Sequence, residues 1–225
     1  MRQKREIRDG CAASHAMDIV GERWALVVAR ELMLGPKRFT DLRAGLPGIS
    51  PNVLTQRLEE LEAASVLRRR KLPPPVSAQV YELTEWGLEL EPVLKALGHW
   101  GVRSPALPMG KPLSVDGLIM SLRTMFDGGR AGDFKARIGI QLGEERFDVD
   151  IAAGQMKLVR GASPKPDAVL ETDLETLGGL AYLGLKLSDV LHDGKAKVEG
   201  DRAVLKRFFT LFPLPEPAPV TAQPV

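Results

Sequence analysis

Polar and basic side chains between residues 49 and 84 carry the clearest chemistry of this chain. Ser50 and Pro51 are typical of a helix start, because a serine hydroxyl can accept hydrogen bonds from free backbone N–H groups and proline suits the first helical position. Residues 52–64 then place leucines at i, i+4 and i+7 on one helical face. The opposite face carries Asn52, Thr55, Gln56 and Glu59. Amide and hydroxyl groups in this arrangement can hydrogen-bond to base edges of DNA.

A basic hairpin follows this helix. Residues 67–71, Leu-Arg-Arg-Arg-Lys, and residues 79–83 favour two strands, and the three prolines between them favour a turn. Strand alternation places Arg69 and Lys71 on one face, where both could contact phosphates. A polar-faced helix followed by a basic hairpin is typical of a winged helix-turn-helix, so the segment predicts binding to double-stranded DNA.

The candidate DNA contacts are the side chains in this region that could reach a base edge or a phosphate. They are Lys37, Arg38, Ser50, Asn52, Thr55, Gln56, Arg57, Arg69 and Lys71. Lys37 and Arg38 precede a predicted helix at residues 39–46, so we expect them to contact the DNA backbone. The competing interpretations are a solvated helix face and an ordinary run of surface charge. The net charge of +2 is small, so affinity for DNA has to come from such local clusters.

Other helices are expected at residues 14–20, 22–34 and 85–102. The last of these is rich in leucine and tryptophan and exposes more apolar surface than one small domain can bury. Palindromic DNA half-sites lie about 34–36 Å apart and suit a two-fold partner. We therefore expect a homodimer on a palindromic operator, formed through this helix, with the first helix as a further candidate.

Two proline-rich stretches divide the chain. They predict a DNA-binding and dimerisation domain at residues 1–103, a linker at 104–112, a second domain at 113–212 and a disordered tail at 213–225. The second domain mixes amphipathic helices with alternating strands, expected at residues 135–142, 146–151, 156–160, 168–171 and 195–199. Its helices are expected after the cap Ser114 through Phe126 and at 174–184, 188–192 and 203–212, with a turn at 128–132. The predicted class is α+β: an N-terminal winged helix-turn-helix, then an antiparallel sheet with helices on one face.

The helices of this second domain are unusually apolar, and glycines between them could leave room for a ligand. The candidate ligand-binding residues are Leu180, Leu183, Leu187, Leu191, Phe208, Phe209 and Phe212. Two alternatives stay open. These side chains could be ordinary core, and the domain could stabilise a dimer without binding anything.

Two families resemble the two halves of the chain. Residues 8–103 resemble HxlR-type bacterial regulators at Cys11, Gly21-Glu22-Arg23-Trp24 and residues 38–42, 48–54, 57–61 and 81–87, although Ser65 stands where that family usually has glycine. This resemblance implies a homodimer with the polar-faced helix in the major groove. Residues 113–212 resemble the sterol carrier protein type two fold at residues 138–151, 173–177 and 194–201. That resemblance implies a tunnel for a fatty-acyl or sterol-like ligand.

Other functions find little support in the residues. The three histidines are scattered without metal-ligand spacing, residues 128–132 lack the lysine of a phosphate-binding loop, and no nucleophile elbow is present, so we expect no catalytic residues, metal or cofactor. No apolar run is long enough to span a bilayer, and a single cysteine fits the reducing cytoplasm. The sequence thus predicts a cytoplasmic transcriptional regulator, more specifically a repressor, modulated by an apolar ligand. The alternatives are a redox or electrophile sensor acting through Cys11 and a lipid-binding carrier or scaffold protein.

Overall fold

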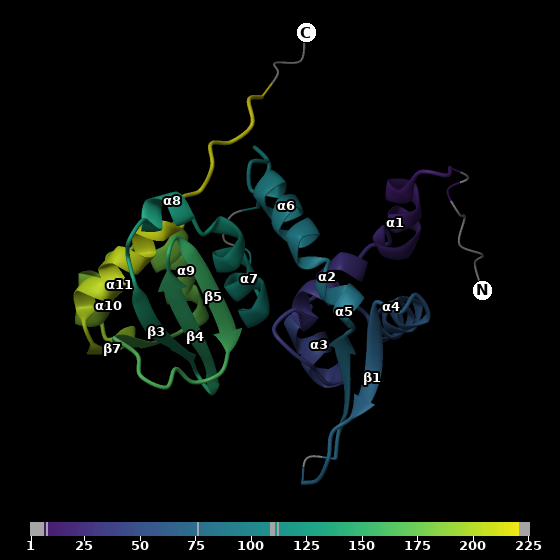
Figure 1. Cartoon of the computed structure of the whole chain (residues 1–225), viewed down its shortest axis with the longest axis horizontal. Coiled ribbons are helices and arrows are strands. Elements are labelled where there is room, and N and C mark those ends of the chain that lie inside the picture. The colour runs from purple at the N-terminus through teal and green to yellow at the C-terminus, as the bar shows by residue number, and fades with distance from the viewer. Residues whose placement is uncertain (1–6, 8, 76, 109–110, 112, 221–225) are drawn as a thin grey trace. The chain divides into compact units, whose positions relative to one another are not determined.

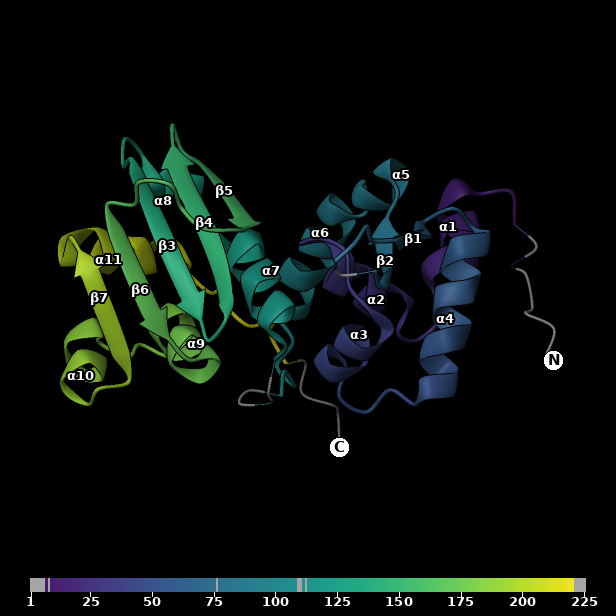
Figure 2. The ribbon, with the colours of Figure 1, turned by 90° about the horizontal axis from the view of Figure 1, so that it is seen from below.

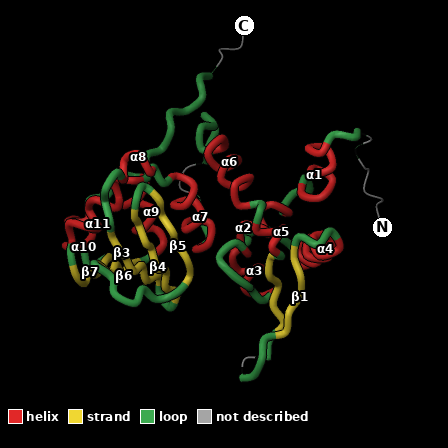
Figure 3. The backbone as a smooth tube through the Cα atoms, in the orientation of Figure 1, coloured by secondary structure: helices red, strands yellow, loops and turns green. Residues whose placement is uncertain are grey.

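The computed structural model describes residues 7, 9–75, 77–108, 111 and 113–220. The chain forms two compact units, Met1–Leu94 and Lys95–Val225. The first is largely helical with a small hairpin, and the second combines a sheet with helices, so the predicted α+β class is confirmed (Figure 3). Residues 213–220 contain no helix or strand. None of the helices that the structure describes has the length and apolar character needed to cross a bilayer.

The first unit is built around α2 and α4. Its elements are α1 (Ala12–Val20), α2 (Ala25–Leu32), α3 (Phe39–Gly45), α4 (Pro51–Ala63), β1 (Leu67–Lys71), β2 (Gln79–Leu83), α5 (Glu85–Leu88) and α6 (Glu91–Gly101), the last of which continues beyond this unit. Figure 2 shows α4 as a rod beside α2 and α1. Leucines of α4 and Val28 and Leu32 of α2 are almost completely buried. This apolar core fixes which face of α4 meets solvent.

The segment predicted as one helix over residues 85–102 is two helices. The first, α5, ends after a single turn, and α6 starts with Glu91 and Pro92. Proline has no backbone N–H and its ring collides with the preceding turn of a continuous helix, whereas it is well tolerated in a first turn. Pro92 therefore explains the break. The prediction of a single helix was wrong.

The second unit contains a five-stranded sheet in the order β5-β4-β3-β6-β7. Its strands are β3 (Ala136–Leu142), β4 (Glu145–Ala152), β5 (Gln155–Arg160), β6 (Ala168–Thr172) and β7 (Ala196–Gly200). Three of the pairings are antiparallel, but β6 runs parallel to β3. The antiparallel prediction was thus wrong in one pairing, and the sheet is mixed. The reason is that residues 161–167 carry the chain back across β4 and β3, so that β6 joins the free edge of β3 in the same direction.

Helices cover one face of this sheet. They are α7 (Val115–Met125), α8 (Gly128–Ala131), α9 (Leu174–Tyr182), α10 (Leu187–His192), α11 (Arg202–Phe208) and the short 3-10 helix η1 (Phe209–Leu211). Figure 1 shows α9 and α11 behind the sheet. Alternate strand residues, among them Ile138, Ile140, Phe147 and Val149, are buried on the helical side. The turn expected at residues 128–132 is instead the one-turn helix α8, capped by Asp127.

Candidate DNA-binding surface

The polar face of α4 is presented to solvent by the burial of its apolar face. Leu54, Leu58 and Leu61 have at most 1% exposure, which anchors the helix to the core. The Ser50 hydroxyl caps the helix by accepting a hydrogen bond from the Val53 backbone N–H at 3.3 Å. The exposed face carries Asn52, Thr55, Gln56 and Glu59, as the sequence pattern predicts. Gln56 donates to Glu60 on the next turn at 3.0 Å, so its amide is already oriented along the helix.

A tight turn joins α4 to the basic hairpin. Ser65 has φ of +60°, a left-handed conformation that favours glycine. The Val66 backbone N–H donates to the Leu61 carbonyl at 2.9 Å, which closes the helix end, and the Thr84 hydroxyl donates to the Ser65 carbonyl at 2.8 Å. The turn is therefore formed with serine in the place of glycine, and it sets the direction in which β1 leaves α4.

The hairpin of β1 and β2, hereafter the wing, carries four consecutive cations. Arg68 and Arg70 both point to Glu82 on β2, with Nε–carboxylate distances of 2.8 and 2.9 Å. Burial raises the pKa of Glu82, but the hydrogen bonds and charges of Arg68 and Arg70 outweigh burial, and the net pKa is lowered. One carboxylate thus holds two guanidinium groups, which leaves the pair with a net positive charge.

The other face of β1 carries Arg69 and Lys71. Arg69 Nε lies 2.8 Å from a Glu62 carboxylate oxygen on α4, and its guanidinium lies 5.7 Å from the centre of the Tyr81 ring. Within the described part of the chain, Lys71 makes no ion pair and is exposed. Of the four wing cations, Lys71 alone would therefore contact a phosphate without breaking an ion pair within the described residues.

Two of the candidate DNA contacts are engaged inside the protein. Lys37 Nζ lies 2.9 Å from Glu31, whose side chain has no exposure, and its backbone pairs with Tyr81 on β2. Arg57 is 6% exposed, and its Nη1 lies 2.6 Å from Glu60 and 3.6 Å from Glu22. Each cation neutralises a carboxylate within the first unit, so a DNA contact through Lys37 or Arg57 would compete with an internal ion pair, and both assignments stay predictions. Arg38 is exposed at the start of α3, where its backbone N–H donates to Asp41 at 3.1 Å.

The acidic partners of these cations were not predicted. Glu60 lies one turn from Arg57 and Glu31 six residues before Lys37, whereas Glu22 is distant in sequence and only the fold brings it near Arg57. Arg68 and Arg70 were also not among the predicted contacts, although the wing presents both. A simple signal was available for them, since all four cations of the wing are consecutive.

Cys11 lies at the N-terminus of α1 and is exposed. Hydrogen bonds from the backbone N–H groups of Ala13 and then Ser14 to the sulfur lower the pKa of the Cys11 thiol. Asp9 accepts hydrogen bonds from the Cys11 backbone N–H at 3.1 Å and from the Ser14 hydroxyl at 2.7 Å. The thiol is therefore both accessible and shifted towards its reactive thiolate form.

The candidate ligand-binding residues of the second unit divide by burial. Leu180, Leu187, Phe208 and Phe212 are buried, and Leu191 and Phe209 are half-buried. The Phe208 ring contacts those of Phe209 and Phe212, with centroids 5.2 and 4.9 Å apart, and Phe126, which the sequence reading missed, lies 6.3 Å from Phe212. Leu183 is 63% exposed, because α9 ends at Tyr182 and the chain turns at Gly184, so it lies outside this buried group.

The arrangement of the first unit defines a class of protein. A helix with a solvent-facing row of amide and hydroxyl side chains, followed by a cationic wing, is the structure of a winged helix-turn-helix DNA-binding protein. Comparison with known proteins makes this more specific. Residues 19–106 match the HxlR-like helix-turn-helix family, and residues 127–213 match the SCP-2 sterol transfer family.

Individual relatives agree with the first of these matches. The chain is similar to the uncharacterized HTH-type transcriptional regulator YybR of Bacillus subtilis, with 34% identity over 45% of this chain and 83% of the relative. It is also similar to the HTH-type transcriptional regulator YodB of that organism, with 36% identity over 38% of this chain and 76% of the relative. A solved structure of quinone-bound YodB from B. subtilis is 33% identical over 39% of this chain and 92% of that chain, with a TM-score of 0.35.

The chain belongs to the HxlR-like helix-turn-helix family and is a DNA-binding transcriptional regulator of this type. It carries in addition a domain of the SCP-2 sterol transfer family.

Proposed function

We propose that the protein is a homodimer that binds a palindromic operator, with α4 in the major groove and the wing on the phosphate backbone. The observation that carries this proposal is the exposed row of Asn52, Thr55 and Gln56 directly followed by a wing strand of four cations. Amide side chains can form paired hydrogen bonds to adenine, and arginine and lysine neutralise phosphates. Arg57 and Lys37 are left out because they neutralise Glu60 and Glu31.

The dimer part of the proposal rests on α6. No residue of this helix is buried within the described chain, and Val93, Leu97 and Trp100 at i, i+4 and i+7 are each about half exposed or more. A row of large apolar side chains at this spacing is expected to pack against an equivalent helix. A two-fold axis through α6 would place two copies of α4 on successive half-sites.

The DNA contacts can be tested on a duplex selected from a random pool by the full-length protein. Gln56→Ala should weaken binding to the selected duplex by about 1–3 kcal/mol, the discrimination expected of one bidentate base contact. The same variant should bind a scrambled duplex as the wild type does. Equal losses on both duplexes would show that Gln56 does not read sequence.

The second domain supports a role for an apolar, fatty-acyl or sterol-like ligand that weakens operator binding, so that the protein acts as a ligand-relieved repressor. The SCP-2 match and the buried apolar side chains of α9, α10 and α11 support this part. Ligand and operator would then oppose each other reciprocally, with a coupling of about 1–3 kcal/mol. Operator affinity measured with and without palmitate tests the coupling, and equal affinities with palmitate demonstrably bound would refute it.

Native mass spectrometry identifies any lipid that co-purifies. Leu180→Trp places a larger side chain at a buried position and should reduce lipid binding. The matched control is Leu183→Trp, three residues away, where 63% exposure leaves room for the indole and lipid binding should persist.

A second candidate function is electrophile sensing, and the exposed Cys11 thiol with its lowered pKa favours it. The solved structure of YodB with a bound quinone suggests a probe for the experiment. Benzoquinone, an electrophile that adds to thiolates, should release the operator from the wild type but not from Cys11→Ser. A lipid carrier or scaffold whose winged helix binds protein would lack the steep salt dependence on duplex DNA that several phosphate contacts produce.

A further inference from the structure

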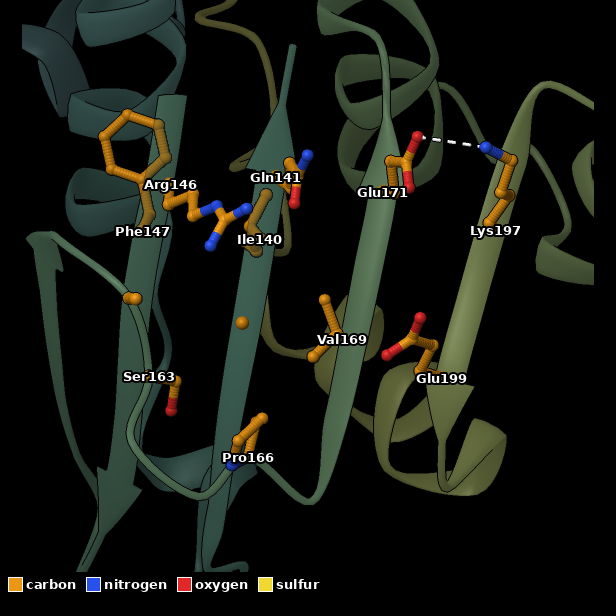
Figure 4. A pocket seen from close by; sticks show the side chains of 12 residues that line it. Ile140, Gln141, Arg146, Phe147, Ser163, Pro166, Val169, Glu171, Lys197 and Glu199 are labelled. Atoms are coloured by element: carbon orange, nitrogen blue, oxygen red, sulfur yellow. Dashed lines mark hydrogen bonds and ion pairs between the residues drawn. The ribbon is translucent and has the colours of Figure 1, made fainter. Parts of the chain in front are cut away.

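The sheet face opposite the helices contains a cavity of about 300 Å³ that has no part in the function proposed above. Figure 4 shows it across β4, β3, β6 and β7, with residues 161–167 along one side. Gly139 forms part of its floor, paired with Asp148 on β4 and Val169 on β6. Gly139 has no side chain, and the Val169 side chain lies so close that a Cβ on Gly139 would come within 3.3 Å of it. The volume lies at the lower end of the range for small-molecule sites.

Residues 161–167, which form one wall of this cavity, are hydrogen-bonded to the sheet at both ends. Gly161 N–H donates to the Arg146 carbonyl at 2.8 Å, and Asp167 N–H donates to the Arg137 carbonyl at 2.7 Å. The Asp167 carboxylate accepts from the Arg137 backbone N–H at 2.7 Å, and its carbonyl accepts from Asp201 N–H at 2.9 Å. Hydrogen bonds within the protein therefore fix both ends of this segment, so binding would cost little ordering of the chain.

Several polar groups at the cavity lack a partner within the described residues. The Ser163 hydroxyl oxygen is buried and makes no hydrogen bond there. The guanidinium of Arg146 and the carboxylate of Glu199 form no ion pair with a described residue, whereas Lys197 lies 3.1 Å from Glu171. Arg146 and Glu199 are exposed to solvent, but the Ser163 hydroxyl is buried, and a buried polar group without a partner is uncommon in native proteins and calls for an explanation. A ligand that supplies the missing contacts is one.

The charges select a class of ligand. A free guanidinium at one end of the cavity suits a carboxylate, which it can bind through two parallel hydrogen bonds. The carboxylate of Glu199 at the other end, on β7 three strands away in the sheet order, favours an ammonium group, whereas the charge of Glu171 is neutralised by Lys197. Val169 and Gly139 between these ends provide an apolar floor. A small molecule with a carboxylate at one end and an ammonium at the other meets all three conditions.

We propose that this cavity binds a free amino acid or an equally small zwitterionic carboxylic acid, with its carboxylate on Arg146 and Ser163 and its ammonium group on Glu199. The site lies on the opposite face of the sheet from the apolar helices. The two kinds of ligand would therefore not compete for the same space.

Ligand-observed NMR of the full-length protein with the standard free amino acids tests the proposal, followed by calorimetric titration of those that bind. At least one amino acid should bind with a Kd below about 10 mM. Arg146→Gln and Glu199→Gln should each weaken its binding by about 10-fold to 100-fold, the effect of losing a hydrogen bond to a charged group. Lys157→Gln is the matched control, because it removes an exposed cation from β5 outside the cavity and should leave binding unchanged.

Analogues of the bound amino acid that lack either its ammonium or its carboxylate distinguish a zwitterion site from a simple ion site. Both should bind at least about 10-fold more weakly. The proposal fails if no free amino acid binds, if an analogue binds as tightly as the amino acid, or if Arg146→Gln, with unchanged thermal unfolding, binds as well as Lys157→Gln. Failure would leave operator and palmitate binding untouched, so it can be told apart from failure of the proposed regulatory function.

Discussion

The Lys37 ammonium lies 2.9 Å from the carboxylate of Glu31, a side chain with no exposed surface. Arg30 contacts the other oxygen of the same carboxylate at 2.7 Å. Lys37 also pairs through its backbone with Tyr81 on β2. The ion pair therefore joins the end of α2 to the base of the wing.

Removal of this cation should destabilise the first unit. Lys37→Met leaves a buried carboxylate with one partner fewer, and we expect the free energy of unfolding to fall by about 1–3 kcal/mol, less than the 3–5 kcal/mol typical of a buried pair because Arg30 remains. Urea denaturation measures the change. The double variant with Glu31→Gln removes the buried charge as well and should recover part of the loss. A double variant no more stable than Lys37→Met alone would contradict this account.

A substitution in the turn after α4 should increase the stability of the first unit. Ser65 has φ of +60°, where a side chain is strained and glycine is not. Ser65→Gly should therefore raise the free energy of unfolding by about 0.5–1 kcal/mol. Ala64→Gly, one residue earlier at φ of −82°, is the matched control and should lower it, because glycine there only adds freedom to the unfolded chain. Thermal or urea unfolding compares the two variants, and a destabilised Ser65→Gly would refute the argument.

Local patterns predicted the wing strands and the solvent-facing side of α4, because both follow directly from periodicity and from turn-forming residues. The burial of Arg57 could not be read in this way. Its partner Glu60 is one turn away, but Glu22 comes from the segment after α1, and only tertiary packing brings it near. The parallel pairing of β6 with β3 could not be predicted either, since the alternation of apolar and polar residues identifies a strand but not its neighbours in the sheet.

The unpaired wing cation should report DNA binding through salt dependence. Lys71→Ala should weaken binding to selected and scrambled duplexes alike and reduce the slope of log K against log salt concentration by about 0.9. Arg68→Ala should change the slope less, because Arg68 shares Glu82 with Arg70. Fluorescence anisotropy over a salt series measures both. If the two variants have the same slope, the internal ion pairs of the wing do not influence phosphate contact.

The exposed face of α6 should determine the oligomeric state. Trp100 is 75% exposed, and Trp100→Glu would place a charge in the apolar row of the proposed dimer contact. We expect this variant to be monomeric at micromolar concentration by light scattering. His99→Glu adds the same charge beside the apolar row of α6 and should remain dimeric. If Trp100→Glu also stays dimeric, the contact lies elsewhere, and α1 with its 54% exposed Met17 is the next surface to examine.

The position of Cys11 at the start of α1 predicts a pH dependence of its reactivity. Backbone N–H groups of Ala13 and Ser14 stabilise the thiolate and lower the pKa of the thiol, so a larger fraction is ionised at a given pH than in an unstructured peptide. The rate of alkylation by iodoacetamide should rise with pH and reach half of its plateau at a lower pH in the native protein than in the same protein unfolded in urea. Because Cys11 is the only cysteine, the alkylated mass reports this site alone. Equal midpoints in the two states would mean that the helix N-terminus does not activate the thiol, and electrophile sensing would lose its structural support.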